Sequence, residues 1–282
     1  MIITVASGKG GTGKTTIATN LAVALNRPLT LLDCDVEEPN AHLFLRPEMT
    51  ERFPFEVAVP EIIMEKCTLC GKCQELCQFN ALAVLPQTVL LFPELCHSCG
   101  GCSLICPEQA VVEGRRVMGE VERGRRGQIA FVHGRLRVGE AMAPPLIRRV
   151  KQEAPSHGLT LIDAPPGTSC PVVTTLWGSD FVILVTEPTP FGLHDLELAV
   201  GAIRELQLAC GLVINRADLG DRRVHEYAAR EGLPVLLEIP FDRRAAELYA
   251  QGELPAAILP EWRARLQALA REVFARTGHP FG

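Results

Sequence analysis

Short apolar runs alternate with amphipathic stretches along most of this chain of 282 residues. Apolar runs of four to six residues, rich in Val, Ile and Leu, are typical of strands buried in a parallel sheet. The longer stretches between them repeat apolar residues every three to four positions, which is typical of helices. The alternation predicts an α/β fold, with a mainly parallel sheet flanked by helices and right-handed crossovers. The predicted strands are 1–6, 29–32, 159–162, 181–185, 210–214 and 235–239, and the predicted helices are 14–25, 146–153, 193–208, 222–230, 243–250 and 261–276.

The alternation breaks off in one interval, where eight of the eleven cysteines lie. This interval sustains neither the helical nor the strand period, and it contains an internal repeat. A run of four cysteines, C-x-x-C-x-x-C-x-x-x-C, recurs 29 residues later with the same spacing, and Ala81 and Ala110 follow the two runs at the same offset. The sequence therefore predicts one α/β domain formed by residues 1–59 and 118–282, with a duplicated unit inserted at residues 60–117.

The glycine-rich stretch after the first strand, Gly8–Thr16, opens the first predicted helix. Read as G-x-x-x-x-G-K-[ST], it fits a phosphate-binding loop with Gly8, Gly13, Lys14 and Thr15 in register. Glycines let the backbone turn tightly and direct its N–H groups at phosphate oxygens, and the helix N-terminus adds a positive dipole. Lys14 is expected to reach the β- and γ-phosphates, and the Thr15 hydroxyl is expected to hold Mg²⁺.

A dinucleotide-binding site is the rival interpretation of the same stretch. Its glycines also fit G-x-G-x-x-G, and Asp33 ends the next strand about 20 residues later, where a ribose-binding carboxylate belongs. This interpretation leaves Lys14 and Thr15 without a role. Because a cation and a hydroxyl after the last glycine suit a triphosphate with a metal ion, the sequence favours the phosphate loop.

Three aspartates follow apolar strands in the manner of a nucleotide-binding edge. Asp33 and Asp35 follow the second strand, and Asp163 ends the strand before Ala164-Pro165-Pro166-Gly167. Because the carboxyl ends of parallel strands meet at one edge, these residues and Asn215 are expected near the phosphate loop. Asp163 stands where a Walker B acid holds Mg²⁺ or its water, and Pro-Pro-Gly can form a loop that senses the γ-phosphate. Asp33 and Asp35 are spaced to direct one carboxylate at the metal ion and one at the attacking water.

The cysteine spacing matches the run of bacterial ferredoxins. In that arrangement three cysteines of one run hold a [4Fe–4S] cluster together with the fourth cysteine of the other run. Zinc prefers two C-x₂-C pairs across a longer spacer, so the pattern fits zinc badly; one cluster beside a degraded site is the next alternative. The usual run ends in Cys-Pro, and because Gln78 replaces that proline after the first run, a different bend is expected there. Cluster one is predicted to take Cys67, Cys70, Cys73 and Cys106, and cluster two Cys77, Cys96, Cys99 and Cys102.

Composition narrows the classes of function. The formal net charge is −5, from 28 basic and 33 acidic residues, which argues against general binding to nucleic acid or anionic membranes. The apolar runs are too short to span a bilayer and the first residues lack the basic region of a signal peptide, so a cytoplasmic protein is expected.

Eleven cysteines are a poor disulfide framework, and Cys34, Cys170 and Cys210, outside the runs, are expected to pack as small apolar residues. The arginine-rich stretch 115–137 predicts a solvated hairpin or a docking site for an acidic redox partner.

These motifs resemble those of the MinD, ParA, Mrp and nitrogenase-iron-protein group of P-loop ATPases. Lys9 before the glycines resembles that group's deviant Walker A, Asp33-Cys34-Asp35 its switch I, and Asp163–Thr168 its Walker B and switch II. Asn215 resembles the adenine-reading asparagine, and Ile239-Pro240-Phe241-Asp242 the adenine-flanking loop. The chain looks like the MinD-superfamily ATPases that carry an inserted ferredoxin domain. The resemblance implies ATP contacts at Gly8, Lys9, Gly10, Gly11, Thr12, Gly13, Lys14, Thr15, Thr16, Asn215 and Pro240, Mg²⁺ at Thr15, Asp33 and Asp163, and catalysis by Lys9, Lys14 and Asp35.

The resemblance also implies a nucleotide-dependent homodimer in which Lys9 reaches the partner's nucleotide. The last predicted helix lacks the basic face of a MinD membrane helix, and no cysteine after Cys210 supplies the C-x-x-C of Mrp-type carriers. The expected function is ATP hydrolysis coupled to electron transfer through two [4Fe–4S] clusters, with a redox or cluster-acceptor protein as partner. An ATP-dependent iron–sulfur assembly or carrier protein is the alternative, and an amide ligase of the cobyrinic-acid type would need a glutaminase domain for which this length leaves no room.

Overall fold

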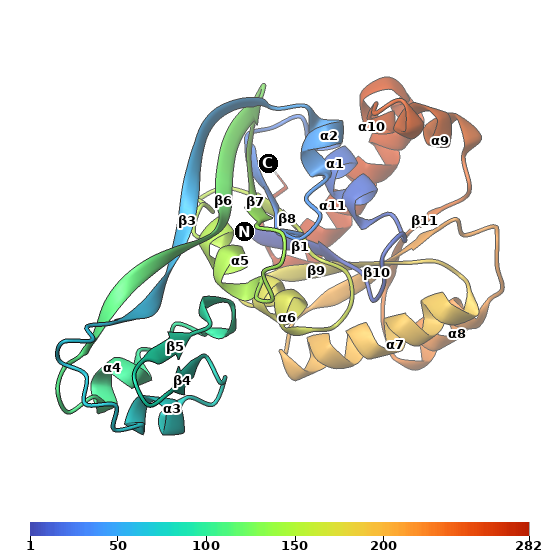
Figure 1. The fold of residues 1–282 in the computed structure, drawn as a ribbon. Helices are drawn as coiled ribbons and strands as arrows, with labels where there is room; N and C mark the ends of the chain where they lie inside the picture. The colour runs from blue at the N-terminus through green and yellow to red at the C-terminus, as the bar shows by residue number, and fades with distance from the viewer. Residues whose placement is uncertain (282) are drawn as a thin grey trace. The chain divides into compact units, whose positions relative to one another are not determined.

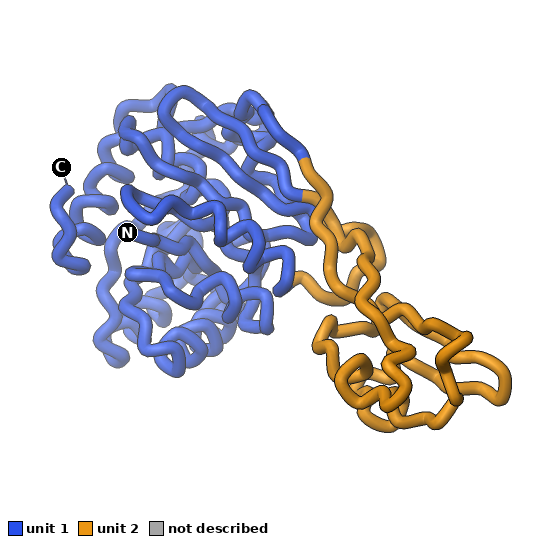
Figure 2. The backbone as a smooth tube through the Cα atoms, turned by 90° about the vertical axis from the view of Figure 1, so that its left-hand side faces the viewer, with its two compact units in different colours: residues 1–52, 121–135, 144–282 blue, residues 53–120, 136–143 orange. Residues whose placement is uncertain are grey.

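The computed structural model describes residues 1–281, which form two compact units (Figure 2). Unit 1 contains residues 1–52, 121–135 and 144 onward, and unit 2 contains residues 53–120 and 136–143. Two long strands, β3 (Glu48–Ile62) and β6 (Val111–Arg126), each have one part in unit 1 and the other part in unit 2. The chain therefore passes between the units along these two strands, and again before and after residues 136–143. The predicted insert at residues 60–117 lies inside unit 2.

A nine-stranded sheet has the order β11-β10-β9-β1-β8-β2-β7-β6-β3 (Figure 1). Neighbouring strands from β11 to β7 pair in parallel, as expected when helical crossovers connect them. The predicted α/β fold with a mainly parallel sheet is thus confirmed. The strands of this parallel part are β1 (Ile2–Ala6), β2 (Leu29–Asp33), β7 (Ile129–Leu136), β8 (Thr160–Asp163), β9 (Phe181–Thr186), β10 (Cys210–Asn215) and β11 (Val235–Ile239).

Helices cover both faces of the parallel sheet because its strands are apolar on both sides. Successive residues of a strand point to opposite faces, and in β9 Ile183 joins one buried cluster while Leu184 joins the other. The first cluster includes residues of α1 (Lys14–Leu25) and α11 (Pro260–Thr277), and the second includes residues of α6, α7 and α8. The other helices of unit 1 are α2 (Ala41–Leu45), α5 (Pro144–Lys151), α6 (Cys170–Leu176), α7 (Pro190–Glu205), α8 (Arg223–Arg230), α9 (Arg243–Ala250) and α10 (Pro255–Ile258).

The strands and helices predicted from apolar periodicity are present, each within a few residues of its predicted ends. Strand β3 is not predicted, because Pro54 and Pro60 remove backbone donors and charged residues interrupt the apolar run. It stands at the end of the sheet order, where proline is tolerated. Helices α2, α6 and α10 are also not predicted, because each is too short to show a helical period. The predicted hairpin is present as β6 and β7, with a turn at Gly127.

Unit 2 contains two short helices and a small sheet in addition to its parts of β3 and β6. Helices α3 (Lys72–Leu76) and α4 (Gly101–Ile105) each lie within one cysteine run, 29 residues apart. Strand β4 (Leu82–Val84) pairs antiparallel with β5 (Val89–Leu91), and β6 begins at the residue that corresponds to the start of β4. The repeat in the sequence is therefore also a repeat of local structure.

Candidate functional site

The loop between β1 and α1 turns through glycines with left-handed backbone. Gly11 has φ 81° and Gly13 has φ 97°. A Cβ on Gly13 would lie 2.6 Å from Asn215 Nδ2, and a Cβ on Gly8 would lie 2.1 Å from the carbonyl oxygen of Asp195. The loop thus combines positive φ with close approach by neighbouring segments, which is what a phosphate-binding backbone requires.

Three predicted carboxylates gather beside this loop because β2 and β8 are neighbours in the sheet. Asp33 pairs in register with Asp163, and Thr15 Oγ1 donates a hydrogen bond to Asp163 Oδ2 at 2.6 Å. Lys14 Nζ lies 3.1 Å from Asp35 Oδ2, and both side chains are 10% exposed. Asp163 Oδ1 is buried and has no hydrogen-bond partner within residues 1–281. A buried carboxylate oxygen without a donor, beside a threonine hydroxyl, fits a divalent cation.

The crowding of these buried groups changes their protonation. Burial and then the charge of Asp163 raise the pKa of Asp33, against the opposing effect of backbone N–H bonds. Burial also raises the pKa of Asp163, although Lys14 and Thr15 act to lower it. Burial alone would lower the pKa of Lys14, but the charges of Asp163 and Asp35 outweigh burial and raise that pKa. One lysine thus faces three carboxylates, and a bound divalent cation would relieve the excess negative charge.

Asp33 also fixes the segment that follows β2. Its Oδ1 accepts a hydrogen bond from the backbone N–H of Asp35 at 3.1 Å. Its Oδ2 accepts from the backbone N–H groups of Asn40 at 3.1 Å and Ala41 at 3.0 Å. The segment that resembles switch I is therefore wrapped around one carboxylate and leads directly into α2. The contact of Asp33 with Mg²⁺ stays a prediction.

A cavity of about 350 Å³ lies beside the start of α1 and the carboxyl ends of β10 and β11. Asn215, the last residue of β10, donates from Nδ2 to the carbonyl oxygen of Thr12 at 2.9 Å, which joins the end of the sheet to the glycine-rich loop. Of the predicted residues, Gly11, Gly13, Lys14, Thr15, Thr16, Asn215 and Pro240 line this cavity, whereas Gly8, Lys9, Gly10, Thr12, Asp33, Asp35 and Asp163 do not.

Several residues of the same cavity are not indicated by the sequence. Asn40 enters it from the segment after β2, and Tyr249 and Trp262 enter it from α9 and α11. Tyr249 stacks on Phe44 of α2 with ring centroids 4.2 Å apart, and Trp262 Nε1 donates to Asp242 Oδ2 at 2.9 Å. Both aromatic residues stand at apolar positions of amphipathic helices, so their sequence pattern is that of core residues.

In unit 2 the two cysteine runs have matching backbone conformations. Left-handed φ angles between 50° and 80° recur at three pairs of equivalent positions. Because four of these six residues are not glycine, the conformation is strained and the surrounding structure has to impose it. The pairs are Leu69 and Ser98, Gly71 and Gly100, and Asn80 and Gln109.

The chain bends in the same way after both runs. Asn80 has φ 54° and Gln109 has φ 50°. The expectation of a different bend after Gln78 is therefore wrong. The bend depends on a hydrogen bond that both repeats retain, from the backbone N–H three residues beyond the proline or glutamine to the last cysteine sulfur of the run.

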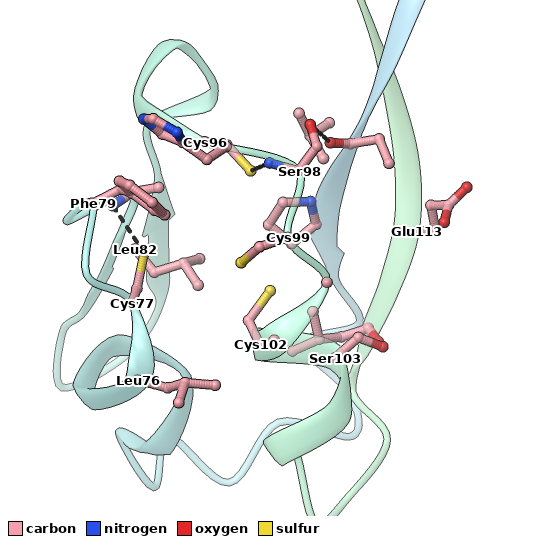
Figure 3. A pocket seen from close by; sticks show the side chains of 18 of the residues that line it. Leu76, Cys77, Phe79, Leu82, Cys96, Ser98, Cys99, Cys102, Ser103 and Glu113 are labelled. Atoms are coloured by element: carbon pink, nitrogen blue, oxygen red, sulfur yellow. Dashed lines mark hydrogen bonds between the residues drawn. The ribbon is translucent and has the colours of Figure 1, made fainter. Parts of the chain in front are cut away.

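The cysteines of unit 2 line two separate cavities. Figure 3 shows the first, where four sulfur atoms from different parts of the repeats point into one space. Each cavity combines three cysteines of one run with the fourth cysteine of the other run, which is the grouping that the ferredoxin spacing predicts. The first cavity is lined by Cys77, Cys96, Cys99 and Cys102, and the second by Cys67, Cys70, Cys73 and Cys106.

Backbone N–H groups are directed at several of these sulfur atoms. Ala81 donates to Cys77 Sγ at 3.4 Å, and Ala110 donates to Cys106 Sγ at 3.3 Å. Such bonds stabilise thiolates and influence cluster potentials. Across residues 1–281, no set of three or more His, Cys, Asp or Glu side chains converges on a position for a single metal ion. Four thiols around an apolar cavity, with N–H donors at the sulfurs, fit a [4Fe–4S] group.

The three cysteines outside the runs differ in environment. Cys34 is fully buried, and its burial raises the pKa of the thiol, so it is an inert packing residue as predicted. Cys210 is half-buried against the core of α7 and α8. Cys170, at the start of α6, is exposed, so the expectation that it packs in the interior is wrong.

Arginines of the stretch 115–137 make contacts within the chain. Arg116 pairs with Glu140, and Arg123 pairs with Glu51 and Glu153. Arg126 donates to the carbonyl oxygens of residues 44 and 45 at the end of α2. Much of this positive charge is therefore committed to the hairpin and its neighbours. No helix within residues 1–281 has the length and apolar character needed to cross a membrane.

The chain is similar to several known proteins. Residues 3–256 match the family described as the CobQ/CobB/MinD/ParA nucleotide binding domain. An uncharacterized protein of Methanocaldococcus jannaschii is 28% identical over 264 residues, covering 90% of both chains. An iron–sulfur cluster carrier protein of Pyrococcus furiosus is 24% identical over 280 residues, covering 90% of this chain and 81% of the carrier.

Two further similarities concern the insert and the overall fold. Ferredoxin-1 of Chlorobaculum tepidum is 31% identical over 58 residues, which are 18% of this chain and 94% of the ferredoxin. The fold is similar to the septum site-determining protein MinD of Pyrococcus horikoshii, solved with Mg-ADP. The superposition covers 98% of this chain and 97% of the MinD chain, with a TM-score of 0.60 and 21% sequence identity.

Proposed function

Because the chain belongs to the CobQ/CobB/MinD/ParA nucleotide-binding family, we propose that unit 1 binds and hydrolyses ATP with Mg²⁺. The observation that carries this proposal is the pairing of the two chemical groups at the start of α1. Lys14 is bonded to Asp35 and Thr15 to Asp163, so the cation and hydroxyl of the loop already face the carboxylates of neighbouring strands. These are the groups that a P-loop ATPase uses on the phosphates, the metal ion and the attacking water.

The residues of unit 1 divide this work by position. Mg²⁺, held by Thr15 and Asp163 with Asp33 behind them, would neutralise charge on the phosphates. The ammonium group of Lys14 donates to the Asp35 carboxylate, and its movement to the γ-phosphate would release that carboxylate. The release leaves the Asp35 carboxylate able to accept a proton from a water molecule. Asn215 and Pro240 would hold the adenine of ATP in the cavity that they line together with Thr16.

We extend the proposal to unit 2, as a ferredoxin-like insert with two [4Fe–4S] clusters. The four thiols of each cavity would hold one cluster, and bound clusters would supply one-electron redox chemistry at low potential. The N–H donors on Cys77 and Cys106 would stabilise the thiolate ligands.

Two modes of action are consistent with this pairing of units. The relatives named as iron–sulfur cluster carriers align over nearly the whole chain, and they favour ATP-dependent cluster assembly or delivery. Electron delivery to a redox partner is the second candidate, and the similarity of the insert to a ferredoxin favours it. The first mode requires clusters that leave the protein, whereas the second requires clusters that stay.

We also propose that Lys9 acts across a nucleotide-dependent dimer. It is half-buried in the glycine-rich loop and does not line the nucleotide cavity of its own chain, which is consistent with a role toward a second copy. Sedimentation with and without a non-hydrolysable ATP analogue tests this role. A Lys9→Ala protein that dimerises as the wild type does would contradict it.

Cluster retention distinguishes the two modes. Protein purified without oxygen should contain about eight irons per chain, from two four-iron clusters. Incubation with an iron chelator, with ATP and with ADP, then measures how fast iron is lost. ATP-accelerated transfer of iron to an apo-ferredoxin supports the carrier mode, whereas retention through many ATP turnovers supports electron delivery. Stoichiometric zinc without charge-transfer absorbance would overturn the assignment of both clusters.

A further inference from the structure

Helix α5 packs against α6, which follows the loop after Asp163. Polar contacts link the end of α5 both to α6 and to the strands that lead to unit 2. The contacts involve Lys151 at the end of α5, Glu153 in the turn after it, and Arg123 on β6. All of these residues belong to unit 1. We propose that Lys151, Glu153 and Arg123 form a polar strut that transmits nucleotide-dependent movement of the loop after β8 to strands β3 and β6. The proposal rests on the proposed function and adds to it a coupling between the nucleotide site of unit 1 and the strands that lead to unit 2.

The first link joins α5 to the helix after the nucleotide-sensing loop. Lys151 Nζ donates to the carbonyl oxygens of Thr174 at 3.0 Å, Thr175 at 2.7 Å and Trp177 at 2.5 Å, at the C-terminal end of α6. A cation that satisfies three carbonyls at a helix C-terminus is a firm attachment, because those carbonyls have no partner inside the helix. Displacement of α6 would therefore move Lys151 and α5 with it.

Helix α6 is itself close in sequence to the γ-phosphate end of the site. It begins at Cys170, three residues after Gly167. The backbone N–H of Gly167 donates to the carbonyl oxygen of Ser7 at 3.0 Å, so the loop after β8 is attached to the phosphate loop. A γ-phosphate that draws this N–H toward itself would break the bond to Ser7 and shift the start of α6.

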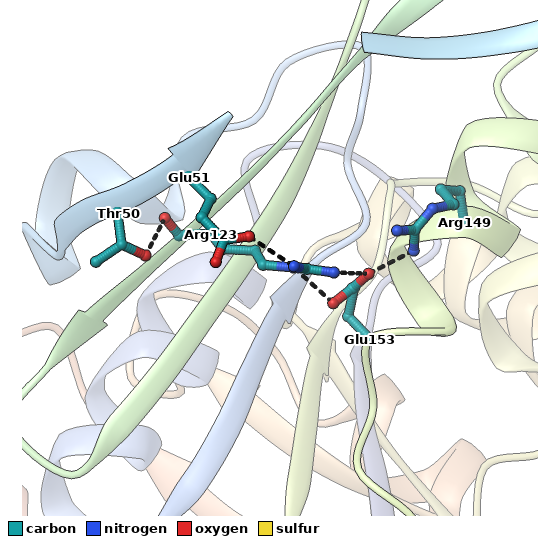
Figure 4. Close-up of polar contacts among 5 residues, drawn as sticks. All are labelled: Thr50, Glu51, Arg123, Arg149 and Glu153. Carbon is teal, nitrogen blue, oxygen red and sulfur yellow. Dashed lines mark hydrogen bonds and ion pairs between the residues drawn. The ribbon is translucent and has the colours of Figure 1, made fainter. Parts of the chain in front are cut away.

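The second link joins the end of α5 to both long strands (Figure 4). Arg123 donates from Nε to Glu153 Oε2 and from Nη2 to Glu153 Oε1, each at 2.8 Å. The same guanidinium donates from Nη1 to Glu51 Oε2 on β3 at 2.7 Å. Thr50 Oγ1 donates to the carbonyl oxygen of Arg123 at 3.3 Å, and Arg149 also donates to Glu153. One arginine thus holds α5, β6 and β3 together.

The contact between Arg123 and Glu51 lies close to the points where β3 and β6 pass from unit 1 into unit 2. Unit 1 ends at Arg52 on β3 and resumes at Val121 on β6. Glu51 and Arg123 therefore lie within two residues of the points where the strands pass into unit 2. A shift of the guanidinium therefore displaces both strands at those points.

The chemistry of the Arg123 contact suits a rigid connection. The pairing with Glu153 is bidentate, and a bidentate charged pair fixes orientation as well as distance. The Glu153 side chain is 13% exposed. Burial raises the pKa of Glu153, but the bonds from Arg123 and Arg149 outweigh burial and hold that pKa below its usual range, so the carboxylate stays charged at neutral pH.

The test compares full-length, cluster-loaded proteins with and without a non-hydrolysable ATP analogue and Mg²⁺. Hydrogen exchange of residues 53–62 and 111–120 reports movement of the strands, and redox titration reports the clusters. The variants are Arg123→Gln, Glu153→Gln and the double variant. Arg123→Lys, which keeps the charge but loses the paired bonds, is the variant to use if Arg123→Gln lowers the melting temperature. Arg204→Gln is the matched control. Arg204 of α7 also forms an ion pair with a glutamate, since its Nη1 lies 2.6 Å from Glu231 Oε2 at the end of α8, but this pair does not contact α5, β3 or β6.

We expect the wild type to show a tenfold difference in nucleotide affinity between redox states, which equals a midpoint shift of about 59 mV for one electron. Each strut variant should reduce this difference below twofold, about 18 mV, and should abolish the nucleotide-dependent change in exchange. ATP turnover should stay within twofold of the wild type. The double variant should lose no more of the midpoint shift than either single variant, because both substitutions remove the same contact. The control should behave as the wild type.

The outcomes separate this inference from the proposed function. A wild-type shift that persists in both single variants would overturn the strut and leave the coupling intact. A wild type that hydrolyses ATP but shows no change in potential or in exchange would overturn the coupling, and with it the strut. Equal losses in the variants and in the Arg204→Gln control would show general destabilisation, which also overturns a specific path.

Discussion

Unit 1 and unit 2 differ in what their buried residues are made of. In unit 1 two clusters of Leu, Ile, Val and Ala side chains lie on the two faces of the parallel sheet, and they include fully buried Leu21, Leu161 and Leu266. In unit 2 a buried cluster consists of Val59, Ala81 and Cys96, with the half-buried Cys77 packed against it. Two of these four residues are predicted ligands of cluster two, so this part of the core of unit 2 is built from its cysteines.

The surface of unit 2 points to the same difference. Large apolar side chains that would be buried in a conventional core are exposed here, and Leu104 on α4 is 89% exposed. A small unit with few buried apolar residues gains little stability from the hydrophobic effect. Metal ligation can supply the missing free energy of folding, because the ligands are brought together only in the folded state. Unit 1 is thus ordered by its core, and we infer that unit 2 is ordered by its ligands.

The largest expected effect is the loss of order in unit 2 when one ligand is removed. Cys102→Ala should lower the iron content from about eight to about four or fewer per chain, because a three-cysteine site binds a cluster poorly. Amides of residues 67–106 should exchange rapidly while those of unit 1 stay protected. Cys170→Ala, at an exposed cysteine outside the runs, is the control and should change neither property. Amides that stay protected in Cys102→Ala protein that has lost iron would show that unit 2 is not ordered by its ligands.

The next largest effect concerns the phosphate loop. Lys14→Ala should reduce ATP hydrolysis by about a hundredfold or more, since charge on the transferred phosphate loses its preorganised partner. Iron content and the exchange of unit 2 should not change, because Lys14 belongs to unit 1 alone. Phosphate release by the purified protein measures the first property, and iron analysis measures the second. Wild-type turnover in this variant would refute the assignment of the loop.

A core substitution in unit 1 should affect that unit alone. Leu266→Ala removes a fully buried side chain of α11 and should cost about 2–5 kcal/mol of unfolding free energy. Denaturant unfolding followed by the far-UV signal measures the cost, and the visible absorbance of the clusters follows unit 2. Leu198→Ala, at a residue that is 51% exposed, is the control and should change stability by about 0.5 kcal/mol or less. If bleaching of the clusters coincides with unfolding in every variant, the two units are not independent.

The smallest effect is expected at a helix cap. Asp242 Oδ1 accepts from the backbone N–H groups of Arg244 and Ala245 at the start of α9, so Asp242→Ala should cost about 1 kcal/mol in unit 1. The bond from Trp262 and these N–H bonds lower the pKa of Asp242. Because the folded pKa is depressed, this stabilisation is present above the ordinary carboxyl pKa and is lost as the pH falls through the folded value. The unfolding curves of the wild type and the variant should therefore differ at neutral pH and converge in acid.

The sequence predicts those features whose chemistry is local. The glycines, Lys14 and Thr15 lie within one short segment, residues 8–16. The cysteine spacing follows from the reach of a short loop around a cluster. Asp33 and Asp163 could be placed together because both end strands of one parallel sheet. For these residues the observed positions agree with the predicted edge of the sheet.

The features that the sequence does not predict depend on segments that are far apart in the chain. Arg123 and Glu153 are 30 residues apart, and neither lies in a motif that would pair them. Tyr249 reaches the nucleotide cavity because α9 packs beside α2, where Phe44 receives its ring. Strand β3 contains Pro54 and Pro60, which argue against a strand unless its place at the end of the sheet is known. Each of these requires the tertiary arrangement, which local periodicity does not contain.

Each cysteine cavity of unit 2 takes three thiols from one repeat and one from the other. Each repeat has four cysteines, but its fourth lies in the cavity of the other repeat. We infer that in an ancestral protein with a single repeat the fourth thiol of a cluster would have come from a second chain. Tandem duplication turns that encounter between molecules into an intramolecular one, at an effective concentration on the order of millimolar. It also ties the inheritance of the two repeats together, because deletion of either would remove a ligand from the other. Their sequences remain free to diverge, as Gln78 and Pro107 have done, while neither repeat can be lost alone.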